Sequence, residues 1–480
     1  MRSRTMSETT GRVALASGLA VILTLLLFGL QAAKPAQAAT TFTVNSPGDG
    51  NDLDFPGGTF DGSSNGKCDV SSATVGDQCT LRAAIQTANK FPGADAIHFG
   101  IPTTSPACVP ATGVCKITPG TRLPLITRPL TIDGYTQSGA TENTLTQLGQ
   151  TNASPKIELD GFTDFAGLVV VGSDASNTVI RGLVINGFNF GILFSGGKGH
   201  NVEGNFIGTD PEGDSDLGNS LSGVVLSNAD GSTVGGASPE ARNLISGNGS
   251  SGDSAGVWVR DGATGNRIQG NLIGTDKTGT APLGNTGNGV FLDDASNNTV
   301  GDADPSDGPT NAANTIAFNA FVGVDVEGAT AGNRILSNSI FSNTGPGIDL
   351  GPDGVTNNDP KDPDAGANHL QNFPIITSAF DLPSGTGING TLDSISSTRK
   401  KKSTFTVQFF SNPAADPSEG KTSLGEVKVT TNRQGKVSFG FSTNAVSEGD
   451  FITATVTRNS TGDTSEFSEA RIVQGPVIGP

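Results

Sequence analysis

The middle of the chain repeats itself. The segment Val202–Asp210 (VEGNFIGTD) returns as Ile268–Asp276 (IQGNLIGTD), 66 residues later. A shorter pattern recurs within this unit: a glycine, an apolar residue, any residue and a second apolar residue. Successive occurrences are 24 to 34 residues apart. They begin at Gly167, Gly191, Gly223, Gly256, Gly289, Gly323 and Gly347. A period of this length is typical of solenoids and other repeat architectures.

A single repeat is too small to bury its own apolar residues. It contains two or three very short strands with alternating apolar and polar residues, separated by Gly and Asn, which tolerate left-handed backbone. Stacking the repeats in parallel pairs each strand with those above and below, and the inward Val, Ile and Leu side chains form one core. The sequence therefore predicts an all-β fold, a parallel β-helix. A β-propeller is the alternative, but its blades need about 40–50 residues each.

Composition agrees with a turn-rich and strand-rich fold. Glycine accounts for 67 of the 480 residues, and charged residues for only 16%. Soluble proteins average about 7% glycine and about 25% charged residues, so a helical bundle is disfavoured. The formal net charge of −17 argues against a nucleic-acid partner, because a phosphate backbone is bound by clustered Lys and Arg.

Several asparagines recur at the turns between the short strands. Their side chains can hydrogen-bond along the axis of a β-helix and satisfy buried turns that would otherwise leave polar groups unpaired. We therefore expect them to stack at one corner of the coils. They are Asn205, Asn248, Asn271, Asn319 and Asn338.

The N-terminus has the features of a secretory signal peptide. Arginines at positions 2, 4 and 12 precede an uncharged apolar run, Val13–Leu30, and then Ala36-Gln37-Ala38. This order predicts cleavage after Ala38 and no membrane span in the mature chain. The alternative is an uncleaved signal anchor, because the 18-residue run exceeds the usual length of about 7–15.

All four cysteines lie early in the mature region, at Cys68, Cys79, Cys108 and Cys115. In an exported chain the local disulfides Cys68–Cys79 and Cys108–Cys115 are the simplest of the three possible pairings. A zinc site with four cysteine ligands is the alternative. It is disfavoured because separations of 11 and 7 residues are longer than the steps of zinc knuckles.

One stretch, residues 79–90 (CTLRAAIQTANK), predicts a helix, with Leu81, Ala84, Ile85 and Ala88 on one face. A helix placed before the coils would cap the open end of the solenoid. The segment Cys79-Thr-Leu-Arg-Ala-Ala84 resembles the motif that gives CSLREA-domain proteins their name, although Thr80 replaces its Ser and Ala83 its Glu. Pro129-Leu-Thr-Ile-Asp-Gly134 and the GNLIGTD-type repeats also resemble the β-helix of these proteins.

This resemblance covers nearly the whole mature chain. It implies an exported, right-handed parallel β-helix of the pectate-lyase-like superfamily. The family carries no established catalytic set, so the resemblance transfers no active-site residue.

The pattern changes after Asn372-Phe-Pro374. Alternating strand-like segments are separated by polar turns at spacings of roughly 12–20 residues. They lie at 404–410, 424–430, 436–441 and 451–457. The spacing predicts a C-terminal β-sandwich, Ig-like in outline.

One column of predicted outward positions holds candidate functional residues. Two residues after the repeat glycines come Trp258 and Phe291 in adjacent coils, then Asp325 and Asp349. Neighbouring strands lie about 4.8 Å apart, so each pair should be in contact. An exposed aromatic pair is a stacking platform for sugar rings, and we take Trp258 and Phe291 as candidate ligand-binding residues. The alternative is that long insertions fold over this face and bury it.

The two aspartates allow acid/base or nucleophilic cleavage of a glycosidic bond, or binding of Ca²⁺. A lyase would also need an Arg or Lys base beside the metal, for which Arg334 and Arg260 are the candidates by proximity in sequence. Oxygen ligands continue beyond Asp349 in an acidic tract. Its aspartates are Asp353, Asp359, Asp362 and Asp364. Solvated turns are the alternative interpretation of this tract. No cofactor is required by the sequence, and Ca²⁺ is the one candidate.

The remaining polar signals favour structural roles. His98, His200 and His369 are scattered without metal-ligand spacing, and Arg399–Lys402 is the one basic run. A surface salt bridge is expected in the outward column of Arg260, Asp293 and Glu327.

Five segments are expected: a signal peptide at 1–38, an N-terminal cap with the first strands at 39–130, the β-helix at 131–368, the sandwich at 369–474 and a tail at 475–480. We expect a secreted or cell-surface protein with a structural or adhesive role, whose candidate partner is a polysaccharide or cell-envelope glycan. The alternative is a polysaccharide lyase or glycoside hydrolase that acts on an acidic glycan. The sequence specifies no oligomeric state.

Overall fold

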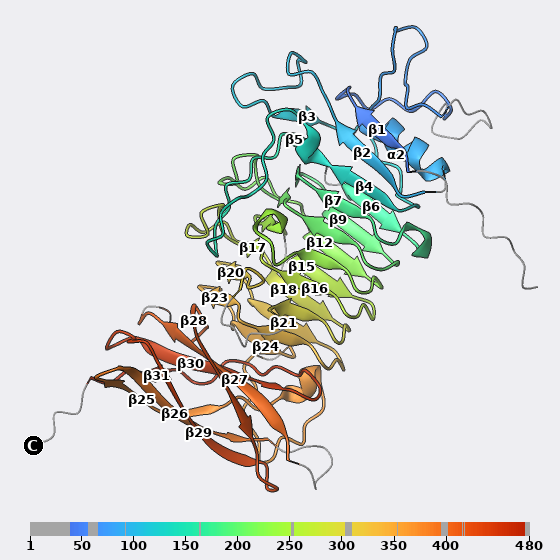
Figure 1. The fold of residues 1–480 in the computed structure, drawn as a ribbon. Coiled ribbons are helices and arrows are strands. Elements are labelled where there is room, and N and C mark those ends of the chain that lie inside the picture. The colour runs from blue at the N-terminus through green and yellow to red at the C-terminus, as the bar shows by residue number, and fades with distance from the viewer. Residues whose placement is uncertain are drawn as a thin grey trace, which may run out of the picture. The chain divides into compact units, whose positions relative to one another are not determined.

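Residues 39–480 form one compact unit in the computed structural model (Figure 1). The structure describes residues 39–55, 66–91, 93–162, 165–250, 254–302, 310–352, 354–394, 402–414, 416 and 418–475. The expected signal peptide, 1–38, lies outside the described residues. No helix in the described part of the chain has the length and apolar character needed to span a bilayer.

Three parallel sheets make up the first and larger part of this unit. Sheet A contains β1 (Thr41–Val44), β2 (Asp95–Phe99), β4 (Leu130–Asp133), β7 (Val179–Arg181), β10 (Asn201–Glu203), β13 (Thr233–Gly235), β16 (Arg267–Gln269), β19 (Thr299–Gly301) and β22 (Arg334–Leu336). Sheet B contains β3 (Cys115–Ile117), β5 (Ile157–Asp160), β8 (Leu183–Asn186), β11 (Phe206–Ile207), β14 (Leu244–Ile245), β17 (Leu272–Ile273), β20 (Thr315–Ala317) and β23 (Ser339–Phe341). Sheet C contains β6 (Leu168–Val171), β9 (Phe190–Ser195), β12 (Ser222–Ser227), β15 (Ala255–Arg260), β18 (Asn288–Asp293), β21 (Val324–Glu327) and β24 (Ile348–Leu350).

From β4 onward the chain visits sheets A, B and C in turn, one strand per sheet and coil, which confirms the predicted parallel β-helix. Inward side chains of the same sheet are in register from coil to coil. In sheet A this column is Ile180, Val202, Val234, Ile268 and Val300, each at most 1% exposed. Full burial of such a side chain stabilises a fold by about 1.5–3 kcal/mol, so the stacked coils share one continuous core.

The repeat glycines are explained by a close approach between coils. A Cβ atom at Gly256 would lie 2.8 Å from the carbonyl oxygen of Gly289 and 2.9 Å from Nδ2 of Asn285. The same approach recurs at Gly191, Gly223, Gly289 and Gly323. A larger residue would push neighbouring coils apart at the turn between sheets B and C.

Asparagine side chains form three ladders, one at each turn of the coil. The first ladder contains Asn205, Asn243, Asn271, Asn314 and Asn338. The second ladder contains Asn219, Asn248, Asn285, Asn319 and Asn343. The third ladder contains Asn266, Asn298, Asn333 and Asn368.

The expectation that the recurrent asparagines share one corner is wrong. Asn205, Asn271 and Asn338 belong to the first ladder, whereas Asn248 and Asn319 belong to the second. In the second ladder each Nδ2 group donates to Oδ1 of the next rung at 2.9–3.0 Å. The two turns look alike in sequence because both need left-handed backbone beside a buried amide.

Helix α2 (Leu81–Lys90) lies where the sequence predicts a cap. Thr80 caps its N-terminus, since Oγ1 accepts a hydrogen bond from the backbone N–H of Ala83. Arg82 makes a bidentate ion pair with Asp49, at 2.8 and 2.9 Å. Short 3₁₀ helices follow at η2 (Gly134–Thr136), η3 (Ser173–Ala175), η4 (Pro239–Ala241) and η6 (Ala367–Leu370).

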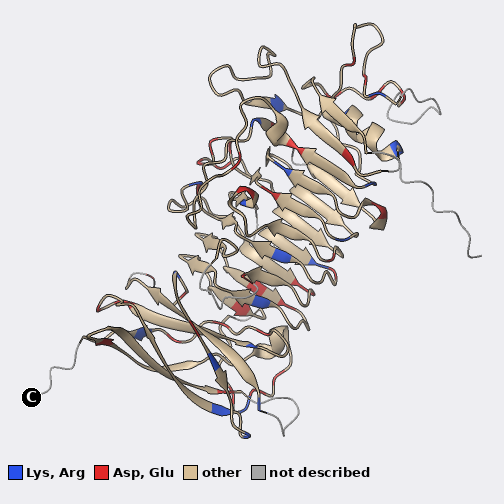
Figure 2. Ribbon diagram, viewed as in Figure 1, with Lys and Arg blue, Asp and Glu red and all other residues tan. Residues whose placement is uncertain are grey.

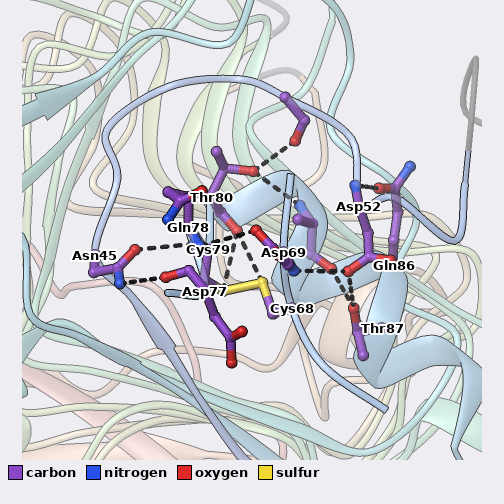
Figure 3. The surroundings of a disulfide bond; sticks show 12 residues. Asn45, Asp52, Cys68, Asp69, Asp77, Gln78, Cys79, Thr80, Gln86 and Thr87 are labelled. Carbon is purple, nitrogen blue, oxygen red and sulfur yellow. Dashed lines mark hydrogen bonds between the residues drawn. A yellow bond between two sulfur atoms is a disulfide. The ribbon is translucent and has the colours of Figure 1, made fainter. Parts of the chain in front are cut away.

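The structure confirms both predicted disulfides, and a four-cysteine zinc site is therefore wrong. Figure 3 shows Cys68–Cys79 beside α2. The carboxylate of Asp52 links this region to the helix by accepting from the hydroxyl of Thr87 and from the backbone N–H of Asp69, both at 3.1 Å. Burial raises the pKa of Asp52. The disulfide and these bonds hold the segment preceding α2 together and join it to the helix.

Two antiparallel sheets follow the β-helix and form the sandwich. One contains β25 (Ile375–Leu382), β26 (Gly385–Asp393) and β29 (Lys436–Thr443). The other contains β28 (Thr422–Thr430), β27 (Thr404–Asn412), β30 (Phe451–Arg458) and β31 (Arg471–Ile472). The four predicted strands correspond to β27, β28, β29 and β30, while the hairpin β25–β26 was not anticipated. The sheets share a core that includes Ile388, Phe405, Phe409 and Val456.

The sandwich supplies a hydrogen-bond partner to the last strand of each parallel sheet. For sheet A, the hydroxyl of Thr464 accepts from the backbone N–H of Ile335 at 3.0 Å. For sheet B, Ile340 and Gly420 form a backbone bridge. For sheet C, Glu466 accepts from the backbone N–H of Leu350 at 3.0 Å. Open sheet edges invite pairing with other chains, so the sandwich closes the end of the solenoid.

Candidate functional site

The predicted outward column of sheet C exists in the predicted register. Its members pair from coil to coil as Val169, Leu193, Val225, Trp258, Phe291, Asp325 and Asp349. The five apolar residues, Val169 to Phe291, form a continuous line across five coils, which we name the sheet C stripe. Val225 is buried at 2% exposed, whereas the other four are half-buried. The alternative that this face is covered therefore holds for only part of the stripe.

Trp258 and Phe291 form the aromatic end of the sheet C stripe. Their ring centroids are 5.8 Å apart and the ring planes differ by 15°, so the two rings stack. The guanidinium of Arg260 lies 4.5 Å from the centroid of Trp258, within the range of a cation–π interaction. The strand geometry fixes both rings because β15 and β18 are adjacent parallel strands.

Charged side chains accompany the aromatic pair on the same face. Arg260 forms an ion pair with Asp261 at 2.9 Å, and Asp293 and Glu327 are register neighbours one column away. Burial raises the pKa of Asp293. The earlier strands of sheet C, β6, β9 and β12, carry no charged residue, and Figure 2 shows where Lys, Arg, Asp and Glu lie along the chain. The aromatic pair is thus an apolar platform with an adjacent cation and adjacent anions.

The structure brings Asp325 and Asp349 together, as the sequence predicts, but both are buried, at 7% and 5% exposed. Oδ2 of Asp325 accepts a hydrogen bond from Asn288 at 2.8 Å. Burial, followed by Glu327 and Asp349, raises the pKa of Asp325 to about 7. A carboxyl group that is half protonated near neutrality can act as a general acid. Its burial leaves no room for a sugar to reach it in this state.

A third carboxyl group closes this cluster from the sandwich. Glu466 accepts from the backbone N–H groups of Leu350 and Thr356, at 3.0 and 2.8 Å. Burial raises the pKa of Glu466 to about 7, and a hydrogen bond with Asp349 adds to the increase. Glu419 similarly accepts from Asn343, the last rung of the second ladder, and burial raises the pKa of Glu419 to about 8.

These shifts predict that the protein loses stability as the pH rises from about 5 to about 9. A carboxyl group whose pKa is higher in the folded than in the unfolded chain stabilises the fold while it is protonated. The contribution is complete below the unfolded value of about 4.3 and is lost as the pH passes the folded values. We expect the thermal midpoint to fall by several degrees between pH 5 and pH 9, as measured by circular dichroism.

Glu466→Gln keeps a neutral side chain at every pH and should flatten this dependence. Glu212→Gln is the matched control, because Glu212 is exposed. An equal slope in the two variants would show that the carboxyl groups between the β-helix and the sandwich do not set the pH dependence.

The remaining predicted catalytic residue lies on a different sheet. Arg334 begins β22 in sheet A, where it pairs with Thr299, whereas Asp325 and Asp349 lie in sheet C. The structure therefore does not bring Arg334 to the two aspartates as a base.

The structure gives the candidate calcium ligands that it describes other surroundings. Asp362 is buried and forms an ion pair with Arg458 at 2.7 Å. Burial and the nearby Asp364 raise the pKa of Asp359, and Asp353 lies outside the described residues. In the part of the chain that the structure describes, no three His, Cys, Asp or Glu side chains are grouped to hold a metal ion.

The histidines occupy structural surroundings. His200 stacks on Phe194 with 4.4 Å between ring centroids, and burial lowers its pKa. His369 pairs with Asp463 at 3.1 Å, and His98 lies in β2. Of the basic run, only Lys402 is described, and it is exposed.

Glu466 and Glu419 were missed by sequence reasoning. Each lies more than 70 positions from its partners in the last coil. No periodic pattern connects such positions, since they meet only when the sandwich closes the solenoid. Both residues lie outside the strands in polar segments, so the sequence offers no signal for them.

No protein-family model matches the chain, and no curated protein matches its sequence. Among solved structures, the full-length tailspike protein 2 from Escherichia coli O157:H7 bacteriophage CAB120 is similar, with a TM-score of 0.29 and 10% identity, over 86% of this chain and 68% of that chain. The enzymatically active domain of tailspike protein 2 of bacteriophage CBA120 has a TM-score of 0.28 and 10% identity, over 84% of this chain and 75% of that chain. At these TM-scores neither protein indicates what this chain binds.

Proposed function

We propose that the chain is an exported surface or extracellular protein with an adhesive role, and that it binds a polysaccharide along the sheet C stripe. The observation that carries the proposal is the stacked pair of Trp258 and Phe291. Sugar rings stack on aromatic faces, and Arg260 and Asp293 beside the rings offer hydrogen-bond partners for hydroxyl groups. The linear stripe over successive coils suits an extended chain of sugars.

Export is supported by the N-terminal sequence and by the two disulfides, which persist in oxidising compartments. We also assign the region around α2 to the CSLREA type. The support is that Thr80 serves as the N-cap in place of the motif's Ser, and that Arg82 finds its acidic partner in Asp49 although Ala83 replaces the motif's Glu.

Binding is favoured over catalysis because the acidic residues that would act on a glycosidic bond are buried. Asp325 and Asp349 face Asn288 and the sandwich residue Glu466. The aromatic pair, by contrast, is half-buried and partly open to solvent.

Trp258→Ala should weaken binding to the recognised polysaccharide about 10-fold, which corresponds to about 1.4 kcal/mol. The measurement is a glycan array followed by affinity electrophoresis with the polysaccharide that binds best. Phe162→Ala is the matched control, since Phe162 is an exposed aromatic residue outside the stripe, at 52% exposed. The control should bind as the wild type does.

A reducing-sugar or unsaturated-product assay run in parallel tests the enzymatic alternative. Turnover that disappears in Asp325→Ala or Asp349→Ala would replace the binding proposal with a lyase or hydrolase. Equal affinity of Trp258→Ala and Phe162→Ala would remove the stripe as the binding site.

A further inference from the structure

A groove of about 980 Å³ lies on the outer face of sheet B. The strands β20 and β23 form its floor. One wall is the loop Gln147–Gln150 with the turn Thr278–Thr280, and the other is the start of β28 in the sandwich. The groove lies on sheet B and Trp258 does not line it, because Trp258 belongs to β15 in sheet C. The groove is therefore a separate site from the sheet C stripe.

The outward residues of sheet B change from apolar to hydroxyl-bearing where the groove opens. Its outward column is apolar and buried over four coils, with Val184, Phe206, Leu244 and Leu272 packed beneath Ala153. The same column then continues as Thr315 and Ser339, which line the groove. The covering loop therefore ends where the column becomes hydroxyl-bearing. Thr315 is still 7% exposed, whereas Ser339 is half-buried and its hydroxyl donates to the carbonyl oxygen of Lys421 at 2.6 Å.

The wall formed by Gln147–Gln150 is held from inside by a buried arginine. Nη1 of Arg242 donates to the carbonyl oxygens of Gln147 and Gln150, and Nε donates to the carbonyl of Gly270. Arg242 is 2% exposed. A guanidinium group committed to backbone carbonyls fixes the loop, so the groove is formed in advance of any ligand.

Phe318 is the strongest sign that the groove binds something. Its φ of +60° lies in the left-handed region, which is unfavourable for a bulky residue. Gly247 occupies the corresponding position before the second ladder, with a φ of +73°. Glycine would satisfy this turn without strain, so the turn does not explain the phenylalanine. Its ring stands edge-on to Phe341, with 5.4 Å between centroids, and lines the groove.

The charge of the groove is unusual for this chain. No acidic residue lines it within the described residues, although Asp and Glu outnumber Lys and Arg by 46 to 29. The one charged residue in its lining is Lys421, whose ammonium group lies 4.7 Å from the centroid of Phe341. Two acids lie close to the lining. Asp416 accepts from the backbone N–H and the hydroxyl of Ser342, which lines the groove, and Glu419 accepts from Asn343.

We propose that this groove binds a segment of an acidic polysaccharide, with a sugar ring against Phe318, a uronate carboxylate on Lys421 and a sugar hydroxyl group that donates to Oγ of Ser339. An aromatic ring combined with hydroxyl and amide groups matches a sugar. The ammonium group of Lys421, the one charged group among the described lining residues, selects the anionic form by attraction, and the nearby carboxylate of Asp416 is already hydrogen-bonded to Ser342.

Two matched probes test the proposal by isothermal titration calorimetry. β-1,4-linked oligomannuronate and β-1,4-linked oligomannoside share their linkage and differ in the carboxylate. The wild-type protein should bind the uronate at least 10-fold more tightly at low salt, and the preference should shrink as salt is raised. Equal affinity for the two probes would overturn the proposal, as would binding of poly-glutamate with the affinity of the uronate.

Three variants connect the preference to the groove. Lys421→Gln should weaken uronate binding about 10-fold and leave oligomannoside binding unchanged. Lys428→Gln, which changes an exposed lysine of β28, should alter neither affinity. Phe318→Gly should weaken the binding of both probes about 10-fold and keep the wild-type thermal midpoint, since glycine suits the left-handed turn.

Equal uronate affinity of the two lysine variants would overturn the assignment of Lys421. Retained uronate binding in Trp258→Ala distinguishes this groove from the sheet C stripe.

Discussion

Asn285→Ala should lower the free energy of unfolding by about 3–5 kcal/mol, because two buried backbone groups lose partners at about 1–3 kcal/mol each and a ladder contact is also lost. Asn285 is fully buried and is the middle rung of the second ladder. Its Nδ2 group donates to the carbonyl of Ile245 at 3.1 Å, and its Oδ1 atom accepts from the backbone N–H of Asn248 at 3.0 Å. Alanine can replace neither bond, and no water reaches the site without opening the coil.

Urea denaturation followed by circular dichroism measures this loss. Asn357→Ala is the matched control, since Asn357 is exposed, and it should change the free energy by no more than about 0.5 kcal/mol. A loss below about 1 kcal/mol in Asn285→Ala would mean that the ladder positions the turns without stabilising them, contrary to the cost of buried unpaired groups.

The sequence predicted sheet C in detail because its glycines mark every coil. Gly256 and Gly289 must approach the next coil closely, so they recur whatever is inserted between them, and the residues that follow keep their register. This is why the neighbours Trp258 and Phe291 were predictable from spacing alone.

The asparagine ladders were harder to separate because insertions change the spacing between rungs. The loop from Gly208 to Gly218 lies between Ile207 and Asn219, whereas Ser246 and Gly247 alone separate Ile245 from Asn248. Both asparagines nevertheless occupy the same ladder. The number of residues between two asparagines therefore does not show which ladder they belong to. The ladder depends on the sheet of the strand that precedes each asparagine.

Contacts between the β-helix and the sandwich were beyond sequence reasoning. Asp349 alternates outward in its strand, which correctly predicts its direction, but the sandwich residue Glu466 then covers it. A side chain that points outward from a strand is exposed to solvent only where no other element packs against that face of the sheet. The same closure explains why an acid pair that suggested catalysis lies buried.

Arg458→Met should destabilise the protein by about 3–5 kcal/mol at pH 7, the usual cost of removing one partner of a buried ion pair. Arg458 donates to Asp362 at 2.7 Å and to the side chains of Gln371 and Ser394, at 3.0 and 2.9 Å. Asp362 also accepts from the backbone N–H of Asn372 at 3.0 Å. Methionine would leave a buried carboxylate without its cation.

The pH dependence of this variant identifies the cause of the loss. Burial already raises the pKa of Asp362, and the attraction of Arg458 opposes that increase, so removal of Arg458 lets Asp362 take up a proton at a higher pH. Arg458→Met should therefore be less destabilising at pH 5 than at pH 7.5 in urea denaturation.

Adding Asp362→Asn to Arg458→Met should restore part of the lost stability, because asparagine tolerates the φ of +60° at this position and carries no charge. Equal losses at both pH values, with no recovery in the double variant, would show that Arg458 acts through packing. A midpoint that falls in EDTA only when Asp362 is intact would instead make Asp362 a calcium ligand.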